Sequence, residues 1–391
     1  MMLREALGIR EELVKNRRWL HIHPEIGFEL HETKAYVCQQ LANMGYTPRD
    51  CGKCGLIADI GTGERLFLLR ADMDALPLRE ESGLDFAPDL GAMHACGHDL
   101  HTAMLLGAAR LLKNHEAELK GRVRLLFQSA EELLEGAADM IADGALRGVD
   151  AAMMIHATVG TPLPTGTAIV CSPGVSAPGA DFFTITIHGK SCHGSAPQNG
   201  VDAILTASHL VLAIQEIQTR ELGLMDGAVL TIGSIHGGTA ANVIADTVTL
   251  KGSLRSMDEG VRQKVKDRLA DISRGISAAF RAEAKVSFDS GCPCLKNDAA
   301  VSQSVTGTLK TMLGENRAFT TAELSPGGKP TAGGSEDFAY ISQQIPAVMV
   351  ALAAGDPGYP LHHPKVRFDE DALPYGAAIY AQCAINWLKG L

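Results

Sequence analysis

The chain has 391 residues, of which 46% are hydrophobic and 20% charged, so it can bury a sizeable core and is not disordered as a whole. Its length suggests two domains, and its net charge of −10 disfavours nucleic acid as a partner. It contains no apolar run of about 18 residues and no apolar signal core near its start, so we expect a cytoplasmic protein without a membrane partner. Nine cysteines, an odd number, indicate reduced thiols or metal ligands rather than a disulfide framework.

Helical and strand patterns alternate in the first part of the chain. Residues 3–44 predict two helices interrupted at His23-Pro24-Glu25, and the apolar spacing over 100–112 predicts another helix. Short apolar runs predict buried strands at 66–69, 123–127, 151–155 and 348–352. This alternation argues for an α/β fold, a doubly wound and mainly parallel sheet with helices on both faces.

The pattern changes after a Pro-, Gly- and Ser-rich stretch at 173–178. A strand with Phe183, Ile185 and Ile187 on one face is followed by a helix at 201–220, strands at 228–235 and 246–255, a helix at 259–280 and a strand at 284–289. The order βαββαβ is ferredoxin-like. We therefore expect residues 1–178 and 291–391 to form the α/β domain, with an α+β domain of residues 179–290 inserted into it.

The densest group of potential metal ligands is the segment MHACGHDLH at 93–101. Cys96 and His98 come immediately before the predicted helix, whose free N–H groups should stabilise the Cys96 thiolate. Gly97 lets the backbone turn so that both side chains face one point. Thiolate and imidazole are ligands for zinc, nickel, iron or manganese; a His-rich helix cap without metal is the alternative.

Glu131 and Glu132 follow the predicted strand at 123–127. In α/β sheets, sites form beyond the carboxyl ends of the strands, where one carboxylate could bind metal while the other accepts a proton from water. A solvated surface pair is the ordinary alternative for two adjacent glutamates.

His156 follows the strand at 151–155, and His362 lies in a Gly/Pro-rich loop. Taken singly, His156 is more often a hydrogen-bonded core residue, and His362 is equally ambiguous. The position of His156 agrees with those of the other candidates, because Cys96, His98, Glu132 and His156 all fall at predicted strand ends or at a helix start. This agreement favours a metal site at one edge of the sheet.

Motifs along the whole chain resemble those of the binuclear metallo-hydrolases of the aminoacylase/carboxypeptidase superfamily. The chain is most similar to the amidohydrolase subgroup that contains hippurate hydrolases, N-acyl-amino-acid amidohydrolases and plant auxin-conjugate hydrolases. The matching motifs are HPEIGFEL at His23, LRADMDALP at Leu69, MHACGHDLHTAMLLGAA at Met93, FQSAEE at Phe127, IHA at Ile155, GKSCHGSAP at Gly189, GGTAANVI at Gly237, GSLRS at Gly252, GGSEDFAY at Gly333 and LHHP at Leu361.

The resemblance implies a role for each candidate residue. Two divalent ions (Mn, Zn, Ni or Co) would be held by Cys96, His98, Glu132, His156 and His362. Glu131 would be the general base, and His193 would reach the partner subunit's site to steady the carbonyl oxygen. Asn242 and Arg255 would contact the substrate, with Arg255 pairing its carboxylate. Other branches of the superfamily have a ligand His where this chain has Asp72, and Asp-type ligands at Cys96 and His156, so the resemblance implies metal binding more firmly than it implies which metal.

We therefore expect a metal-dependent amidohydrolase that cleaves the amide bond of small N-acyl amino acids and forms a homodimer through residues 179–290. A dipeptidase, an N-acetyl-diaminopimelate deacetylase and a non-catalytic binding protein for N-acyl amino acids are the alternatives. The pairs Cys51/Cys54 and Cys292/Cys294 leave a structural zinc or a redox pair open.

Overall fold

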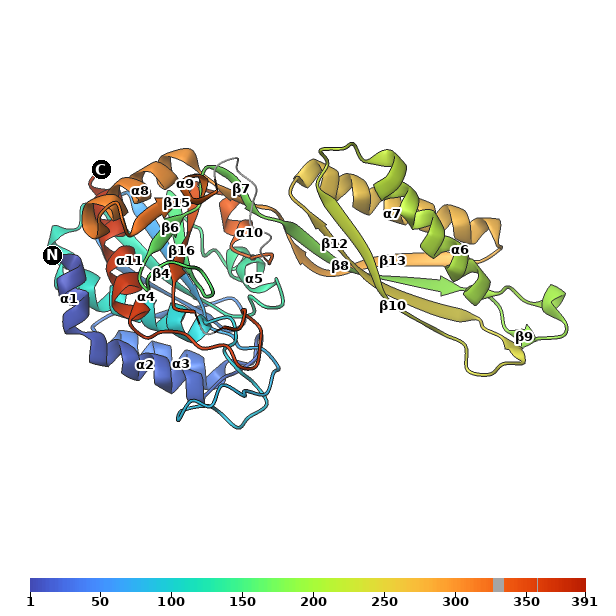
Figure 1. The fold of residues 1–391 in the computed structure, drawn as a ribbon, viewed down its shortest axis with the longest axis horizontal. Coiled ribbons are helices and arrows are strands. Elements are labelled where there is room, and N and C mark those ends of the chain that lie inside the picture. Colours follow the sequence, from blue (N-terminus) through green and yellow to red (C-terminus); the bar gives the residue numbers. More distant parts are fainter. Residues whose placement is uncertain (326–333, 357) are drawn as a thin grey trace. The chain divides into compact units, whose positions relative to one another are not determined.

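The computed structural model describes residues 1–325, 334–356 and 358–391 and divides the chain into two units, which Figure 1 draws as ribbons. The first unit contains Met1–Ser176 and the later segments that begin at Lys296 and Asp337. The second contains Ala177–Leu295 and a short segment that ends at Glu336. Gly333, the first residue of the GGSEDFAY motif, lies outside the described residues.

An eight-stranded sheet forms the centre of the first unit, in the order β1-β2-β4-β3-β5-β16-β6-β15. Its central pairs β4/β3, β3/β5 and β5/β16 are parallel, whereas β2 runs antiparallel to β4. The four strands predicted in this part of the chain are confirmed. The strands are β1 (Arg49–Cys51), β2 (Gly55–Gly61), β3 (Leu66–Asp72), β4 (Arg122–Gln128), β5 (Ala151–Thr158), β6 (Ala168–Val170), β15 (Ala318–Thr320) and β16 (Ala347–Ala353).

Helices surround this sheet, and α4 is buried along nearly its whole length. It packs closely on α11, where a Cβ atom at Gly376 would overlap the sulfur of Met104, so the contact requires glycine. In the described residues, no helix is both long and apolar enough to cross a membrane. The helices are α1 (Met2–Gly8), α2 (Arg10–Ile22), α3 (His31–Asn43), α4 (His98–Asn114), α5 (Gly136–Ala142), α8 (Ala299–Leu313), α9 (Thr321–Leu324), α10 (Ala339–Ser342) and α11 (Ala372–Leu388).

The N-terminal segment differs from its prediction, because it forms three helices instead of two. The additional break is at Ile9, whose backbone leaves the helical region (φ −107°, ψ 14°) and whose N–H bonds to the carbonyl of Ala6. The predicted break at 23–25 is present between α2 and α3.

Four antiparallel strands in the order β10-β12-β8-β13 form the sheet of the second unit. Apart from the short β9 and β11, the chain order of this unit is the ferredoxin-like βαββαβ that the sequence predicted. Phe183, Ile185 and Ile187 pack with α6 and α7 in one apolar core. The elements are β8 (Gly179–His188), β9 (Cys192–His193), α6 (Ala203–Glu216, continued by a π-helical turn Ile217–Glu221), β10 (Ala228–Gly237), β11 (Val243–Ile244), β12 (Thr247–Ser256), α7 (Glu259–Ala279) and β13 (Glu283–Cys292).

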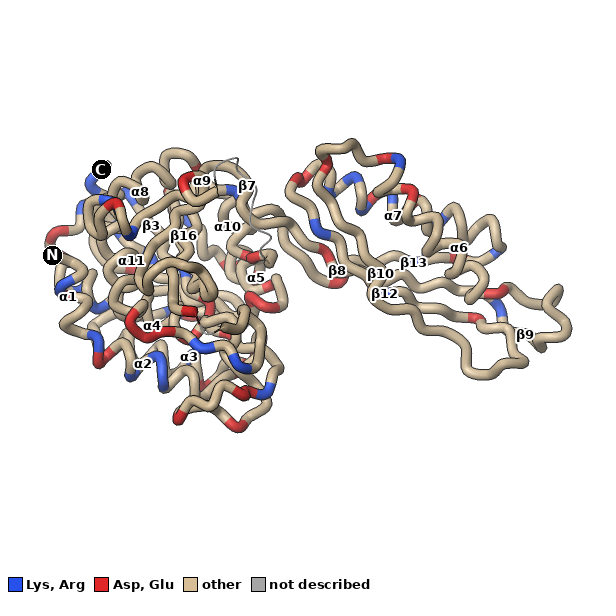
Figure 2. The backbone as a smooth tube through the Cα atoms, viewed as in Figure 1, with Lys and Arg blue, Asp and Glu red and all other residues tan. Residues whose placement is uncertain are grey.

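Two further pairs are small: β9 pairs with β11, and β7 (Gly174–Ala177) pairs with β14 (Leu295–Asn297). The α7 helix is tied to β8 by Asp181, whose carboxylate accepts hydrogen bonds from Arg262 (2.7 and 2.8 Å) and Lys266 (2.7 Å). Figure 2 shows acidic and basic residues interspersed along this helix and along both units.

Candidate metal centre

Three neighbouring strands of the first unit, β4, β3 and β5, bring the candidate residues together. They are parallel, so their carboxyl ends meet at one edge of the sheet, with Asp72 of β3 directly opposite Gln128 of β4. Glu131 and Glu132 follow β4, and His156 lies near the end of β5. The sheet order alone thus places the two glutamates and His156 on either side of the β3 end.

A tight turn after β4 fixes the two glutamates. Ala130 and Leu134 have left-handed backbones (φ 56° and 57°), a conformation that is costly for residues other than glycine. The carboxylate of Asp74 accepts hydrogen bonds from the N–H groups of Glu131 (3.0 Å) and Glu132 (3.2 Å). One side chain therefore sets the position of both glutamates.

His98 points its Nε2 atom at the carboxylates. Its Nδ1 donates to the carbonyl oxygen of Asp74 (2.8 Å), and the preceding Gly97 has φ 88°, which confirms the predicted turn. Nε2 lies 3.9 Å from a carboxylate oxygen of Glu131 and 3.9 Å from one of Glu132. It is buried and has no hydrogen-bond partner, which is the state expected of an atom that binds a cation.

Cys96, His156 and His362 complete the cluster. The Cys96 Sγ lies 3.5 Å from Nε2 of His156, whose Nδ1 donates to the carbonyl of Ala157 (2.7 Å). His362 has a left-handed backbone (φ 64°), and its Nε2 lies 3.4 Å from a carboxylate oxygen of Glu132. Two groups of potential ligand atoms, each with all its atoms within 4.8 Å of one another, together contain the five predicted ligands: Cys96, His98 and His156; and Cys96, Glu132 and His362. All five predicted ligands are therefore neighbours, and Cys96 belongs to both groups. Glu131 forms a further group with His98 and Glu132.

This donor set fits divalent metal ions. Ligand atoms about 2.0–2.3 Å from a tetrahedral ion lie roughly 3.3–3.8 Å apart, close to the separations between Cys96 and His156 and between His362 and Glu132. The Nδ1 bonds of His98 and His156 fix the two rings so that each Nε2 faces the other potential ligands, an arrangement common for histidines that bind metals.

The thiolate of Cys96 is not stabilised by its surroundings, contrary to the sequence-based prediction. Burial raises the pKa of the Cys96 thiol well above its usual range, and Glu132 and Glu131 add to this rise. His98 opposes these effects but does not outweigh them. Burial therefore favours the neutral thiol, and a bound cation would favour the thiolate.

The histidines have different charge states. Burial lowers the pKa of His156 to about 3, so its imidazole is neutral and available as a ligand. Burial also favours the neutral form of His98, but Asp72 and the hydrogen bond to Asp74 outweigh it and raise the pKa of His98 well above its usual value. The surroundings therefore favour the charged form of His98 and the neutral form of His156.

His101 and Asp72 hold the cluster in place. The sequence analysis did not predict this supporting role. His101 Nδ1 donates to a carboxylate oxygen of Asp72 (2.6 Å), and its Nε2 accepts a hydrogen bond from the N–H of Ala157 (2.7 Å). Both ring nitrogens are thus occupied, and His101 positions the strand that carries His156. The spacing of His98 and His101 on one helix face was the available signal.

The other three candidates lie in the second unit. His193 on β9 is exposed, and its Nδ1 accepts a hydrogen bond from the N–H of Ser195 (3.2 Å), so Nε2 carries the proton. Asn242 lies beside it, because its carbonyl accepts the N–H of Gly194 (2.8 Å). Arg255 lies near the far end of β12, with its guanidinium 5.1 Å from the ring centroid of Phe182. The structure brings His193 and Asn242 together and places Arg255 elsewhere in the unit.

The cysteines that the sequence analysis paired lie apart from the candidate metal centre. Cys51 Sγ bonds to the carbonyl of Met140, and Cys294 Sγ to that of Ser256. In the part of the chain that the structure describes, no cluster of potential metal ligands includes Cys51, Cys54, Cys292 or Cys294.

Known proteins are similar to this chain in both sequence and fold. The profile of Peptidase family M20/M25/M40 matches residues 68–386. N-acetyl-L-cysteine deacetylase of Bacillus subtilis is 40% identical over 376 residues, 93% of this chain and 85% of the relative. IAA-amino acid hydrolase ILR1-like 2 of Arabidopsis thaliana is 37% identical over 387 residues, 96% of this chain and 85% of the relative. The structure of Bacillus subtilis YXEP protein, described as a dinuclear metal binding peptidase from the M20 family, has a TM-score of 0.80 at 32% identity and covers 98% of this chain and 99% of its own. This chain therefore belongs to Peptidase family M20/M25/M40, and it is a metal-dependent amidohydrolase that acts on N-acyl amino acids.

Proposed function

We propose that the enzyme hydrolyses its substrates at two divalent ions held by Cys96, His98, Glu132, His156 and His362. The observation that carries this proposal is the convergence of these five side chains into two groups that share Cys96. Zinc, manganese, nickel and cobalt all accept a mixed set of thiolate, imidazole and carboxylate ligands.

Glu131 is the proposed general base. Metal ions bound here would supply polarisation of the amide carbonyl and a lower pKa for water. Glu131 is buried, is held at its N–H by Asp74, and reaches to 3.9 Å from the ligand atom of His98. In this position it can accept the proton of the attacking water and return it to the leaving amine. His193, with its proton on Nε2, would donate a hydrogen bond to the developing oxyanion.

Residues 179–290 are the proposed lid and dimerisation domain. Asn242 and His193 lie beyond one end of β12 and Arg255 near the other, and the eight residue steps from Thr247 to Arg255 span roughly 26 Å of strand. One chain cannot bring both ends to one small substrate. We therefore propose that a second copy supplies His193 while Arg255 binds the substrate carboxylate.

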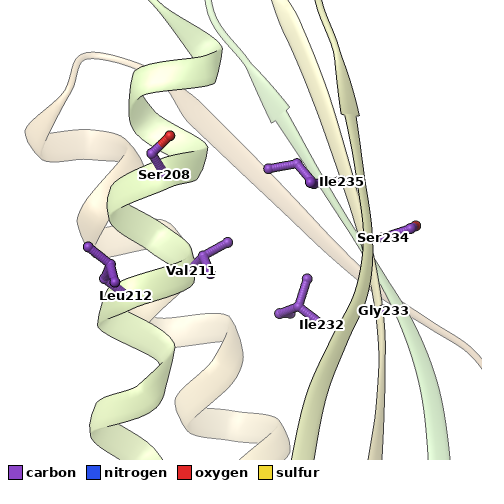
Figure 3. Close-up of a pocket in the computed structure, with 7 residues that line it drawn as sticks. All are labelled: Ser208, Val211, Leu212, Ile232, Gly233, Ser234 and Ile235. Atoms are coloured by element: carbon purple, nitrogen blue, oxygen red, sulfur yellow. The ribbon is translucent and has the colours of Figure 1, made fainter.

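An exposed apolar groove of this domain supports the proposed dimer. β10 is an edge strand, and it forms with α6 an apolar groove of about 500 Å³ in which Val211 faces Ile232 and Ile235 (Figure 3). Leu212 on α6 and Val229 on β10 are 72% and 60% exposed. An exposed strand edge with apolar neighbours is stabilised by pairing, and a two-fold dimer is the commonest form.

Mixing two inactive variants tests the exchange of His193. We expect activity to return when His193→Ala and Glu131→Gln dimers exchange subunits, because each mixed dimer then has one complete site. If subunit exchange is verified and no activity returns, His193 does not act on the neighbouring chain.

The substrate class is tested by blocking the carboxylate. The names of two relatives, N-acetyl-L-cysteine deacetylase and IAA-amino acid hydrolase, support N-acyl amino acids as substrates. Hippurate-like substrates are part of the same proposal. We expect N-acetyl and N-benzoyl amino acids to be hydrolysed and their carboxamide forms to lose most of kcat/KM, with Arg255→Ala reducing this preference. Faster hydrolysis of unacylated dipeptides or of N-acetyl-diaminopimelate would favour the corresponding alternative. The odd number of cysteines, nine, supports a location in the cytoplasm.

A further inference from the structure

A fully buried arginine, Arg70, is connected to the proposed base Glu131 by hydrogen bonds through Asp337. Arg70 of β3 is 0% exposed, and its guanidinium donates hydrogen bonds to Asp72 Oδ2 (2.7 Å), Gln128 Oε1 (2.9 Å) and Asp337 Oδ1 (2.8 Å). Residues two apart on a strand share a face, so Arg70 and Asp72 point the same way, and Gln128 is the register partner of Asp72 on β4. The sheet register therefore builds this network.

Asp337 connects Arg70 to Glu131. Its carboxylate also accepts hydrogen bonds from the side chain of Gln128 (2.7 and 2.8 Å) and from the N–H of Ala137 (2.9 Å). Its own N–H donates a long hydrogen bond to Glu131 Oε1 (3.4 Å), and carboxylate oxygens of the two residues lie within 4.8 Å of each other. Two buried carboxylates this close repel each other, and Arg70 is a cation that offsets the repulsion.

Asp72 connects Arg70 to the metal ligands. Its Oδ2 lies 3.7 Å from Nε2 of His98, and its Oδ1 accepts the bond from His101. A single guanidinium thus binds one carboxylate beside the ligand His98 and another beside Glu131. The three hydrogen bonds come from three different nitrogens, Nε, Nη1 and Nη2, whereas an ammonium group offers a single nitrogen, so lysine would not reproduce all three contacts.

We propose that Arg70 is a positioning residue, which fixes the place of Glu131 relative to the metal ligands through Asp337 and Asp72. The inference rests on the proposed role of Glu131 as the base. Burying a charged network contributes little net stability, and an apolar core of the same volume is often as stable. Misplacement of a reacting group by about 1 Å, in contrast, can cost a hundredfold in rate. The geometric role is therefore the larger one.

A double-mutant cycle separates positioning from plain structural support. We expect Arg70→Lys to lower kcat about 10- to 100-fold, with KM within about twofold and unchanged metal content. In the Glu131→Gln background, Arg70→Lys should change kcat by less than about twofold, because the group that it positions is already gone. Asp337→Asn, which keeps the backbone N–H and the side-chain volume, should give the same pattern and serves as the second variant if Arg70→Lys does not fold.

Arg124→Lys is the matched control. Arg124 of β4 is also buried and bonded, to Asp59 (2.8 and 2.7 Å) and to the carbonyl of Ala145 (2.8 Å), but it contacts none of the candidate site residues. We expect a lower melting temperature and the same kcat. Equal losses of kcat in Arg70→Lys and Arg124→Lys would overturn this inference alone. The same conclusion would follow if Arg70→Lys and Asp337→Asn lowered kcat as much in the Glu131→Gln background as in the wild-type enzyme. An unchanged kcat in Glu131→Gln by itself would overturn the base assignment and this inference with it.

Discussion

Glu131→Gln should retain the metal of the wild-type enzyme and lose at least about a hundredfold in kcat, the usual scale for a positioned acid or base. Glutamine keeps the volume of the side chain and the backbone N–H that bonds to Asp74, so the turn after β4 is preserved. The amide has no basic oxygen that can take a proton from water. Metal analysis and steady-state kinetics on the same preparation measure both quantities.

The neighbouring glutamate provides the opposite variant. Glu132→Gln should lose metal, because the oxygen of Glu132 lies in the ligand group with Cys96 and His362. Glu135→Gln, in the same turn but outside the ligand clusters of the described residues, should change neither quantity. If Glu131→Gln loses metal and recovers activity once metal is restored, the two roles are reversed.

Cys96→Ala should remove most of the bound metal and nearly all activity. The Cys96 sulfur belongs to both groups of potential ligand atoms, so its loss weakens two metal positions at once. Metal analysis after dialysis against a fixed free metal concentration measures the effect.

Cys383→Ala is the matched control for that variant. Cys383 of α11 is as buried as Cys96 but belongs to none of the metal-ligand clusters in the described chain. Its replacement should lower stability through a small cavity and leave the metal content unchanged. Equal metal content in the two alanine variants would show that Cys96 is not a ligand.

The fold was predictable because its signals are local. Buried strands such as Leu66–Asp72 appear as continuous apolar runs, and the alternation of Phe183, Ile185 and Ile187 with threonines marks a half-buried strand. The extra break at Ile9 was missed because the apolar spacing continues through it, although Gly8 directly precedes the break and is the local signal for it.

The candidate site was predictable only in part. Cys96, His98 and Glu132 stand out as residue types with metal chemistry at strand and helix ends. Supporting residues do not, because the roles of Asp74 and Arg70 depend on which strands are neighbours and in which register they pair. The raised pKa of the Cys96 thiol was missed for a similar reason, since burial is a property of the folded chain and not of the local helix start.

The central claim is that metal held by this cluster is required for hydrolysis of N-acyl amino acids. The most direct measurement is the rate of N-acetyl amino acid hydrolysis by enzyme stripped with a chelator and then titrated with zinc, manganese, nickel or cobalt. We predict no activity in the stripped enzyme. On addition of the effective metal, the rate should rise and reach a plateau at about two equivalents of metal per chain. Full activity in protein shown by elemental analysis to contain no metal would contradict the account.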